Sequence, residues 1–276
     1  MEATSLADQR IGFLGAGAMA EALAAGLLEA GVAADALRMA DPDPLRRKHL
    51  QTTLGIEVDA DNPALLDASD IVVVAVKPQV VGPVLQALAD RPERTRPLWI
   101  SLAAGVRLTQ LEELLGDGAR VVRAMPNTPA LVRAGATAIA PNAATTAEDR
   151  RRAEAFFGCV GRCWTAPNEG LLDAVTGLSG SGPAYVFVFL EALGDAGVRM
   201  GLPRDAAYEL AFQTVLGAAK LALEDGRHPA ALKDQVTSPG GTTIAGVERL
   251  EAGGFRAAIH DAVEAATRRS RELAGD

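Results

Sequence analysis

The chain has 276 residues, enough for two medium-sized domains, and its 49% hydrophobic and 22% charged residues are typical of a globular protein with a sizeable core. Its net charge of -8 argues against a nucleic-acid partner, because phosphate backbones are bound by clustered cationic surfaces. The most apolar run, residues 184–194, is interrupted by Glu191, so we expect no membrane segment and a cytoplasmic location.

The first half of the sequence alternates short apolar runs with segments of helical periodicity. The β-branched run at residues 71–78 is typical of a central parallel strand covered on both faces. We expect strands at residues 11–14, 36–41, 56–60, 71–78, 97–105, 119–126, 136–141 and 162–166. Helical patterns separate most of them, at residues 18–31, 44–55, 80–90, 108–116 and 146–161. This rhythm predicts a doubly wound, Rossmann-type α/β domain over residues 8–168.

The second half of the sequence contains helical patterns only, separated by Gly and Pro. They cover residues 171–178, 183–201, 203–226, 229–236, 242–254 and 255–275. The apolar stripes of 183–201 and 203–226 are wider than one buried face requires. We therefore expect an all-helical C-terminal domain, residues 169–276, that dimerises through an interlocked bundle, with a larger intrachain core as the alternative.

A glycine-rich turn, GAGAMA at residues 15–20, follows the first strand and begins a helix. Gly15 permits a tight turn, Gly17 lets a pyrophosphate approach the backbone, and Ala20 keeps the helix close to the strand. The N–H groups at the start of the helix favour anionic oxygen. We expect the whole turn to bind an ADP-containing cofactor, including Ala16, Ala18 and Met19.

Asp41 follows the second strand, where an acidic side chain accepts hydrogen bonds from the adenosine ribose and repels a 2′-phosphate. That position favours NADH. Arg46, Arg47 and Lys48 follow within two turns and could pair with the phosphate of NADPH instead. The choice between NADH and NADPH stays open at this level.

Metal chemistry is not indicated by the cysteines or histidines. Cys159 and Cys163 have no second pair or nearby histidine to complete a zinc site. The histidines at 49, 228 and 260 stand alone on charged or helical segments. We expect no metal ion.

Six segments in this order resemble the pyrroline-5-carboxylate reductase family, over nearly the whole chain. They are GFLGAGAMAEAL (12–23), VAVKPQ (74–79), SLAAGV (101–106), RAMPNTPALV (123–132), VTGLSGSGPAY (175–185) and KDQVTSPGGTTIAGVERLE (233–251). The resemblance implies an oxidoreductase that uses NADPH or NADH to reduce 1-pyrroline-5-carboxylate to L-proline, the last step of proline biosynthesis. It also implies a homodimer or a higher homo-oligomer such as a decamer.

A carboxylated cyclic imine needs an anion cradle and a polar contact to its ring nitrogen. Gly240 and Gly241 precede a helix and present backbone N–H groups that suit a carboxylate. By resemblance, Thr243 is the catalytic residue that hydrogen-bonds the imine nitrogen, and the substrate-binding set is Glu169, Ser238, Gly240, Gly241, Thr242 and Thr243. Helix capping is the alternative for the serine and threonines, and a dipole-stabilised carboxylate is the alternative for Glu169.

Further cofactor contacts are expected at the carboxyl ends of later strands, where ligands of doubly wound sheets bind. They are Ala75, Val76, Lys77, Pro78 and Asn127, and the resemblance to the family implies Asn62, Ala103, Ala104 and Gly105 as well. Ala18 departs from the family pattern, because many members have Asn or Gln there, and its methyl group offers no hydrogen bond. Lys77 could also be a solvated strand-end cation.

Two alternative functions stay open. The chain could be an oxidoreductase with another small substrate, such as a six-membered cyclic imine or a β-hydroxy acid, or it could be a non-catalytic, dinucleotide-binding regulatory protein. The intact threonine and SPGG turn count against the regulatory protein, since a sensor does not need an imine pocket.

Overall fold

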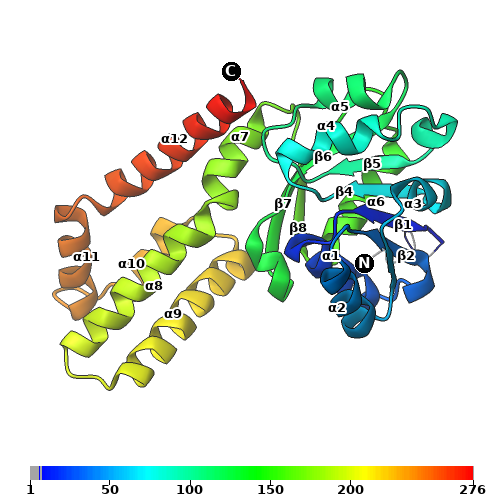
Figure 1. The fold of residues 1–276 in the computed structure, drawn as a ribbon. Helices are drawn as coiled ribbons and strands as arrows, with labels where there is room; N and C mark the ends of the chain where they lie inside the picture. Colours follow the sequence, from blue (N-terminus) through cyan, green and yellow to red (C-terminus); the bar gives the residue numbers. More distant parts are fainter. Residues whose placement is uncertain (1–5, 7, 276) are drawn as a thin grey trace. The chain divides into compact units, whose positions relative to one another are not determined.

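An eight-stranded sheet forms the core of the first of two units in the chain (Figure 1). The structure is a computed structural model that describes residues 6 and 8–275, and the number of strands refers to these residues. The strands are β1 (Ile11–Leu14), β2 (Leu37–Ala40), β3 (Glu57–Asp59), β4 (Ile71–Val74), β5 (Leu98–Ser101), β6 (Arg120–Met125), β7 (Gly135–Pro141) and β8 (Gly161–Thr165). They lie in the order β3-β2-β1-β4-β5-β6-β7-β8, and every pair is parallel except β6 with β7.

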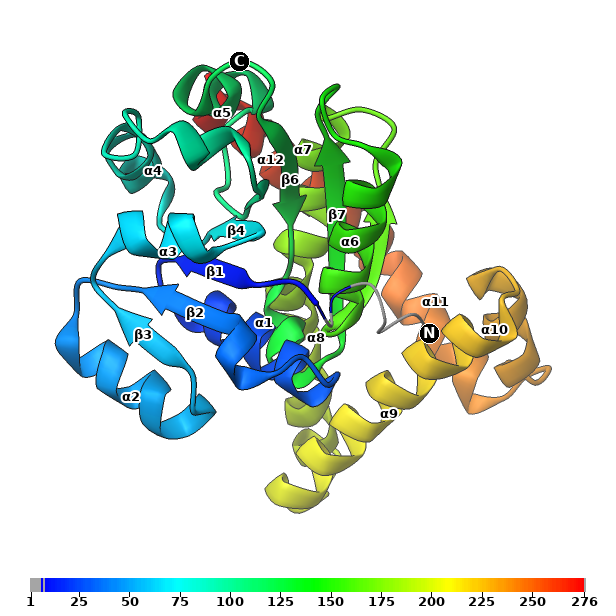
Figure 2. The ribbon, with the colours of Figure 1, turned by 90° about the vertical axis from the view of Figure 1, so that its right-hand side faces the viewer.

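Helices cover both faces of this sheet (Figure 2). Ile11 and Phe13 of β1 pack in one cluster with α1 (Ala18–Glu29), α2 (Pro44–Leu54) and α6 (Ala147–Gly158). Leu14 packs on the opposite face with α3 (Asn62–Ala68), α4 (Pro78–Gln86) and α5 (Leu108–Leu115). Because neighbouring side chains of a strand point to opposite faces, the all-apolar strands serve two cores at once. The predicted doubly wound domain is confirmed.

Short helical segments complete this unit. They are the 3₁₀ turns η2 (Ala34–Ala36), η3 (Pro92–Thr95) and η4 (Thr128–Val132), the helix α7 (Leu171–Val175) and the π-helix η5 (Thr176–Gly180). The single helix expected at residues 171–178 is therefore two segments of different winding. Residues 169–180 and 265–275, assigned by sequence to the C-terminal domain, pack with the first unit.

The second unit, residues 181–264, is entirely helical among its described residues. It contains α8 (Gly182–Arg199), α9 (Arg204–Asp225), α10 (Pro229–Val236), α11 (Thr242–Ala252) and most of α12 (Phe255–Ala274). Gly194 lets α9 approach α8, since a Cβ there would lie 2.9 Å from the Tyr208 ring. Asp195 then accepts hydrogen bonds from Arg204 and Tyr208 across the pair. Nowhere in residues 6 and 8–275 is a helix both long and apolar enough to cross a membrane.

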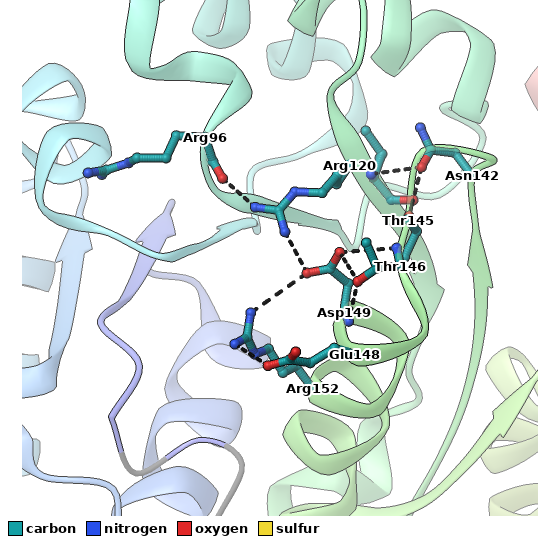
Figure 3. Close-up of polar contacts among 9 residues, drawn as sticks. Arg96, Arg120, Asn142, Thr145, Thr146, Glu148, Asp149 and Arg152 are labelled. Carbon is teal, nitrogen blue, oxygen red and sulfur yellow. Dashed lines mark hydrogen bonds and ion pairs between the residues drawn. The ribbon is translucent and has the colours of Figure 1, made fainter.

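A buried carboxylate joins β6 to the start of α6 (Figure 3). Asp149 is fully buried, and Arg120 of β6 donates to it at 2.8 Å. Thr146 and Asp149 form a capping box, in which each side chain accepts from the other's backbone N–H. Burial alone would raise the pKa of Asp149, but the Thr146 hydrogen bonds and the Arg120 charge outweigh it and hold the pKa below its ordinary value. The ionised carboxylate therefore stabilises the fold.

We expect Asp149→Asn to lower the free energy of unfolding at pH 7 by about 3 kcal/mol, because it leaves the Arg120 charge without its buried partner. A carboxylate whose pKa is lower when folded stabilises above its unfolded pKa, about 3.9, and that stability is lost as the pH falls through the folded pKa. Urea unfolding of both proteins at pH 7 and near pH 3 measures the difference, which should shrink at the lower pH.

Glu148→Gln is the matched control, since Glu148 is 60% exposed and its ion pair with Arg152 lies at the surface. It should cost less than about 1 kcal/mol. An Asp149→Asn effect no larger than that of Glu148→Gln would contradict the assigned role.

Candidate functional site

The carboxyl ends of four neighbouring strands are held in register at one edge of the sheet. Leu14 pairs with Ala40 on one side and Val74 on the other, and Val74 pairs with Ser101. The ladder continues past the strands, since Gly15 donates to the Ala40 carbonyl oxygen at 2.8 Å. The loops after these strands therefore start side by side, where ligands bind in such sheets.

The first of these loops requires glycine at its turn. Gly15 has φ +93°, and a Cβ there would lie 2.8 Å from Val76 Cγ1. Gly17 differs, because its φ is -68° and an added Cβ would meet no described atom within 4 Å. Gly17 is also the N-cap of α1, and no side chain from the described part of the sequence caps that helix. An anionic group can thus approach the helix N-terminus closely, which fits a dinucleotide pyrophosphate.

Side chains from the segment after β2 hold the glycine-rich loop in place. Asp41 accepts from the Ala16 N–H at 3.0 Å, and Arg46 Nε donates to the Ala16 carbonyl oxygen at 2.5 Å. Arg46 also pairs with Glu21 of α1 at 2.6 Å. Burial alone would raise the pKa of Glu21, but hydrogen bonds from Arg46 and His49 lower it overall. Both polar groups of the Ala16 backbone are therefore bound from outside the loop.

The other expected cofactor residues of this unit lie at the same edge. Asn62 begins α3 after β3, and Lys77 is the exposed N-cap of α4 after β4. Gly105 turns the loop after β5 with φ +75°. The remaining members lie beside them in the same loops: Ala75, Val76, Pro78, Ala103 and Ala104. The structure gathers these residues, and their binding of a dinucleotide stays a prediction.

The carboxylate of Glu169 is bound within the first unit. Its carboxylate accepts from Arg123 at 2.7 Å and from the Leu108 N–H at 2.8 Å. Arg123 is only 4% exposed, so this ion pair is shielded from solvent. Glu169 thereby joins β6 to the end of the loop that follows β5. Its proposed substrate contact stays untested.

The C-terminal end of α12 supports the same loop. Ser270 donates to the buried Asp173 at 2.7 Å, and Arg107 lies 3.5 Å from the other carboxylate oxygen of Asp173. A Cβ on Gly105 would lie 3.4 Å from the Leu273 carbonyl oxygen. Residues 102–108 are thus held by segments more than 60 and 160 positions away in the sequence.

The amide of Asn127 is engaged within the protein. Its Nδ2 donates to the Ser179 carbonyl oxygen at 3.0 Å, and its Oδ1 accepts from the Ala136 N–H at 2.8 Å. The turn after β6 is therefore fastened to the π-helix η5, and π-helical turns are frequent at functional sites.

The expected substrate residues other than Glu169 lie in the second unit. Ser238 and Gly241 form a turn closed by a 3.1 Å bond from the Gly241 N–H to the Ser238 carbonyl oxygen. Gly240 has φ +66°, and Gly241 is the N-cap of α11, which begins with Thr242 and the half-buried Thr243. Within the residues that the structure covers, no side chain caps this helix. Its first N–H groups suit a small carboxylate.

The two ends of the chain match different family models. Residues 169–273 match the model described as pyrroline-5-carboxylate reductase dimerisation, and residues 10–105 match that described as NADP oxidoreductase coenzyme F420-dependent. A pyrroline-5-carboxylate reductase of Synechocystis sp. is 50% identical, with 96% of this chain and 98% of that protein covered. The chain belongs to the pyrroline-5-carboxylate reductase family.

Solved structures of this family agree with the fold. The pyrroline-5-carboxylate reductase of Coxiella burnetii is 38% identical with a TM-score of 0.92, covering 96% of this chain and 98% of that one. The Plasmodium falciparum pyrroline carboxylate reductase, whose structure has NADP bound, is 33% identical with a TM-score of 0.86, covering 97% and 99%.

The sequence alone did not identify several residues whose side chains hold the loops of the candidate site in place. Arg123 could have been found, because a charge inside an apolar strand needs a buried partner. Glu21, Asp173 and Ser270 gave no local signal, since each lies on an ordinary helical pattern and acts through a distant residue.

We expect Gly17→Ala to fold normally and to weaken dinucleotide binding at least about tenfold, because the added methyl group would fill only the space of the pyrophosphate. Thermal unfolding and titration with NADH, each without substrate, measure the two effects separately. Gly15→Ala is the contrasting variant, expected to lower stability through its positive φ and its contact with Val76. If Gly17→Ala bound NADH with unchanged affinity, the prediction that the pyrophosphate binds at this loop would be wrong.

Proposed function

We propose that this protein is a pyrroline-5-carboxylate reductase, which reduces 1-pyrroline-5-carboxylate to L-proline with a nicotinamide dinucleotide in the last step of proline biosynthesis. The proposal rests on one observation: the same chain contains the glycine-rich loop before the uncapped helix α1 and the SPGGTT turn before α11. Relatives of that name match along nearly the whole chain, so both features come within a single family assignment.

The turn before α11 is the proposed cradle for the substrate carboxylate. The glycines at 240 and 241 keep the backbone bare, and a Cβ on Gly241 would lie 2.3 Å from Ser238 Oγ. The N–H groups of Thr242 and Thr243 lie in the first turn of the helix, where partial positive charge favours an anion. The carboxylate would fix the ring before the reaction.

Thr243 is the proposed contact to the ring nitrogen. Its hydroxyl can accept a hydrogen bond from a protonated imine and can equally donate one to the neutral amine product. It can therefore hold the nitrogen through the reaction without changing its own charge. The chain's contribution is mainly orientation and the exclusion of water.

The glycine-rich loop and the loops after β2, β4 and β5 would hold the dinucleotide. When bound, NADH or NADPH supplies the hydride that the imine carbon accepts, while the nitrogen carries the proton. Small side chains at Ala103 and Ala104 leave room for a large planar group beside the strand ends.

The second unit is the proposed homodimer surface. Its helices leave many large apolar side chains exposed, among them Phe187, Val188, Leu210, Phe212, Leu216 and Leu221. Exposed apolar surface of this extent marks an interface in soluble proteins. A higher assembly such as a decamer would be built from such dimers.

A cytoplasmic location agrees with the unpaired Cys159 and Cys163, since thiols persist in reducing compartments.

Thr243→Ala is expected to lower kcat/KM for pyrroline-5-carboxylate by roughly tenfold to a hundredfold, because it removes the nitrogen contact. NADH affinity, measured by titration without the imine, should change less than about twofold. Thr243→Ser should recover most of the activity, and Thr214→Ala on α9 is a control for losing an exposed threonine. Full activity of Thr243→Ala would remove this residue from the mechanism.

Leu216→Glu is expected to shift the protein from dimer towards monomer, because it places a charge in the proposed apolar interface, where Leu216 is 61% exposed in one chain. Light scattering at several concentrations gives the mass of each protein. Gln86→Glu adds the same charge to an exposed position of α4 in the first unit and is the matched control. A wild-type protein that is monomeric at micromolar concentration would contradict the interface.

A further inference from the structure

The loop between β2 and α2 determines what the protein can accept next to the adenosine ribose. In doubly wound folds this loop faces the ribose 2′ position, where NADH has a hydroxyl group and NADPH a phosphate. A 2′-phosphate is dianionic or nearly so, and it is held by N–H donors and arginine side chains. Tight binding of NADPH would therefore require such donors in this loop.

The backbone of the loop has no donor to offer such a phosphate from residues 41–45, all of which the structure describes. Asp41 donates across the ladder to β3 at 2.9 Å, and Asp43 donates to the Asp41 carboxylate at 2.9 Å. Leu45 donates to the Asp43 side chain at 2.9 Å. The two remaining residues, Pro42 and Pro44, have no N–H.

The two arginines that follow are engaged elsewhere. Arg46 donates to the Ala16 carbonyl oxygen at 2.5 Å and to Glu21 at 2.6 Å. Arg47 donates to the carbonyl oxygens of residues 41 and 42, both at 2.9 Å. Glu21 also contacts His49 at 3.0 Å, so it engages a second side chain of α2.

Asp41 presents a carboxylate at the same place. One oxygen accepts from the Ala16 N–H and the other from the Asp43 N–H. Each carboxylate oxygen accepts more than one hydrogen bond, so a ribose hydroxyl can still donate to it. A phosphate cannot donate when ionised, and it would meet a like charge that two backbone bonds hold in position.

We propose that this protein selects NADH over NADPH, with Asp41 excluding the 2′-phosphate and Glu21 preventing Arg46 from compensating. The inference rests on the proposed function as a dinucleotide-dependent reductase, and it names the cofactor of that same site. The selectivity depends on the two prolines, on Asp41 and on the Glu21–Arg46 pair, and Asp41 also binds the Ala16 N–H of the glycine-rich turn.

Calorimetric titration of the full-length protein with NADH and with NADPH, without imine, tests the proposal by binding alone. NADPH should bind at least about tenfold more weakly than NADH. Equal or tighter binding of NADPH would overturn the inference and leave the reductase assignment intact. Failure of both dinucleotides to bind would instead overturn the proposed function.

Asp41→Ser removes the charge but retains a hydroxyl group that can accept from Ala16. Its ratio of NADPH to NADH dissociation constants should fall at least about tenfold. Asp35→Ser makes the same change in net charge at the amino end of β2 and should leave the ratio unchanged. An Asp41→Ser ratio equal to that of the wild-type protein would overturn the role of Asp41.

Glu21→Gln added to Asp41→Ser should lower the ratio further, since Arg46 is then released from its carboxylate. Circular dichroism and thermal unfolding establish whether each variant is folded. If a variant does not fold, the ratio of NADPH to NADH dissociation constants of the wild-type protein still tests the proposal. Lys48→Ala is the comparison for the third cation of the run, which is exposed on α2. A larger effect of Lys48→Ala than of Asp41→Ser would also overturn the assignment.

Discussion

The parallel hydrogen-bond ladder around β1 is the constraint on which the rest of the site depends. Leu14 lies between Ala40 and Val74, and bonds from Gly15 to Ala40 and from Ala75 to Leu14, both 2.8 Å, extend the ladder beyond the strands. Parallel strands bring their carboxyl ends to one edge, whereas antiparallel strands would separate the following loops. Both faces of β1 are buried, so a one-residue shift in register would exchange its two cores.

Distant side chains then hold the loops that the ladder brings together. Asp41 and Arg46 bind the two polar groups of the Ala16 backbone, and Glu169 binds both Arg123 and the Leu108 N–H. Buried charges of this kind are costly unless paired, so removing one partner disturbs the other as well. The binding loops are thereby shaped before a ligand arrives, which reduces the ordering that binding requires.

The second unit is organised by a different principle. Glycine at 194 allows α8 and α9 to approach closely, but most of their large apolar side chains remain exposed in the single chain. The predicted wide apolar stripes are present on these helices. Their exposure in the single chain favours an interface over a larger intrachain core. A helix pair can bury only part of such a surface, which is consistent with the dimerisation model that residues 169–273 match.

The sequence by itself determined the doubly wound fold, the helical second half and the family. Periodicity, β-branched runs and glycine positions are local, and they are read without knowing which segments meet. The π-helical turn at residues 176–180 was not predicted, because its winding depends on packing and on the amide of Asn127 bonded to Ser179.

Partners far apart in the sequence were decided only by the tertiary structure. Glu169 was expected at the substrate by resemblance to the family, and only the structure shows that its carboxylate binds a strand residue 46 positions away. Asp41 alone left the choice between NADH and NADPH open, because the neighbouring arginines could have bound the 2′-phosphate of NADPH. Only the fold shows that Glu21 and backbone carbonyl oxygens hold those arginines. Charge in a sequence states what a side chain can bind, and three-dimensional proximity decides what it does bind.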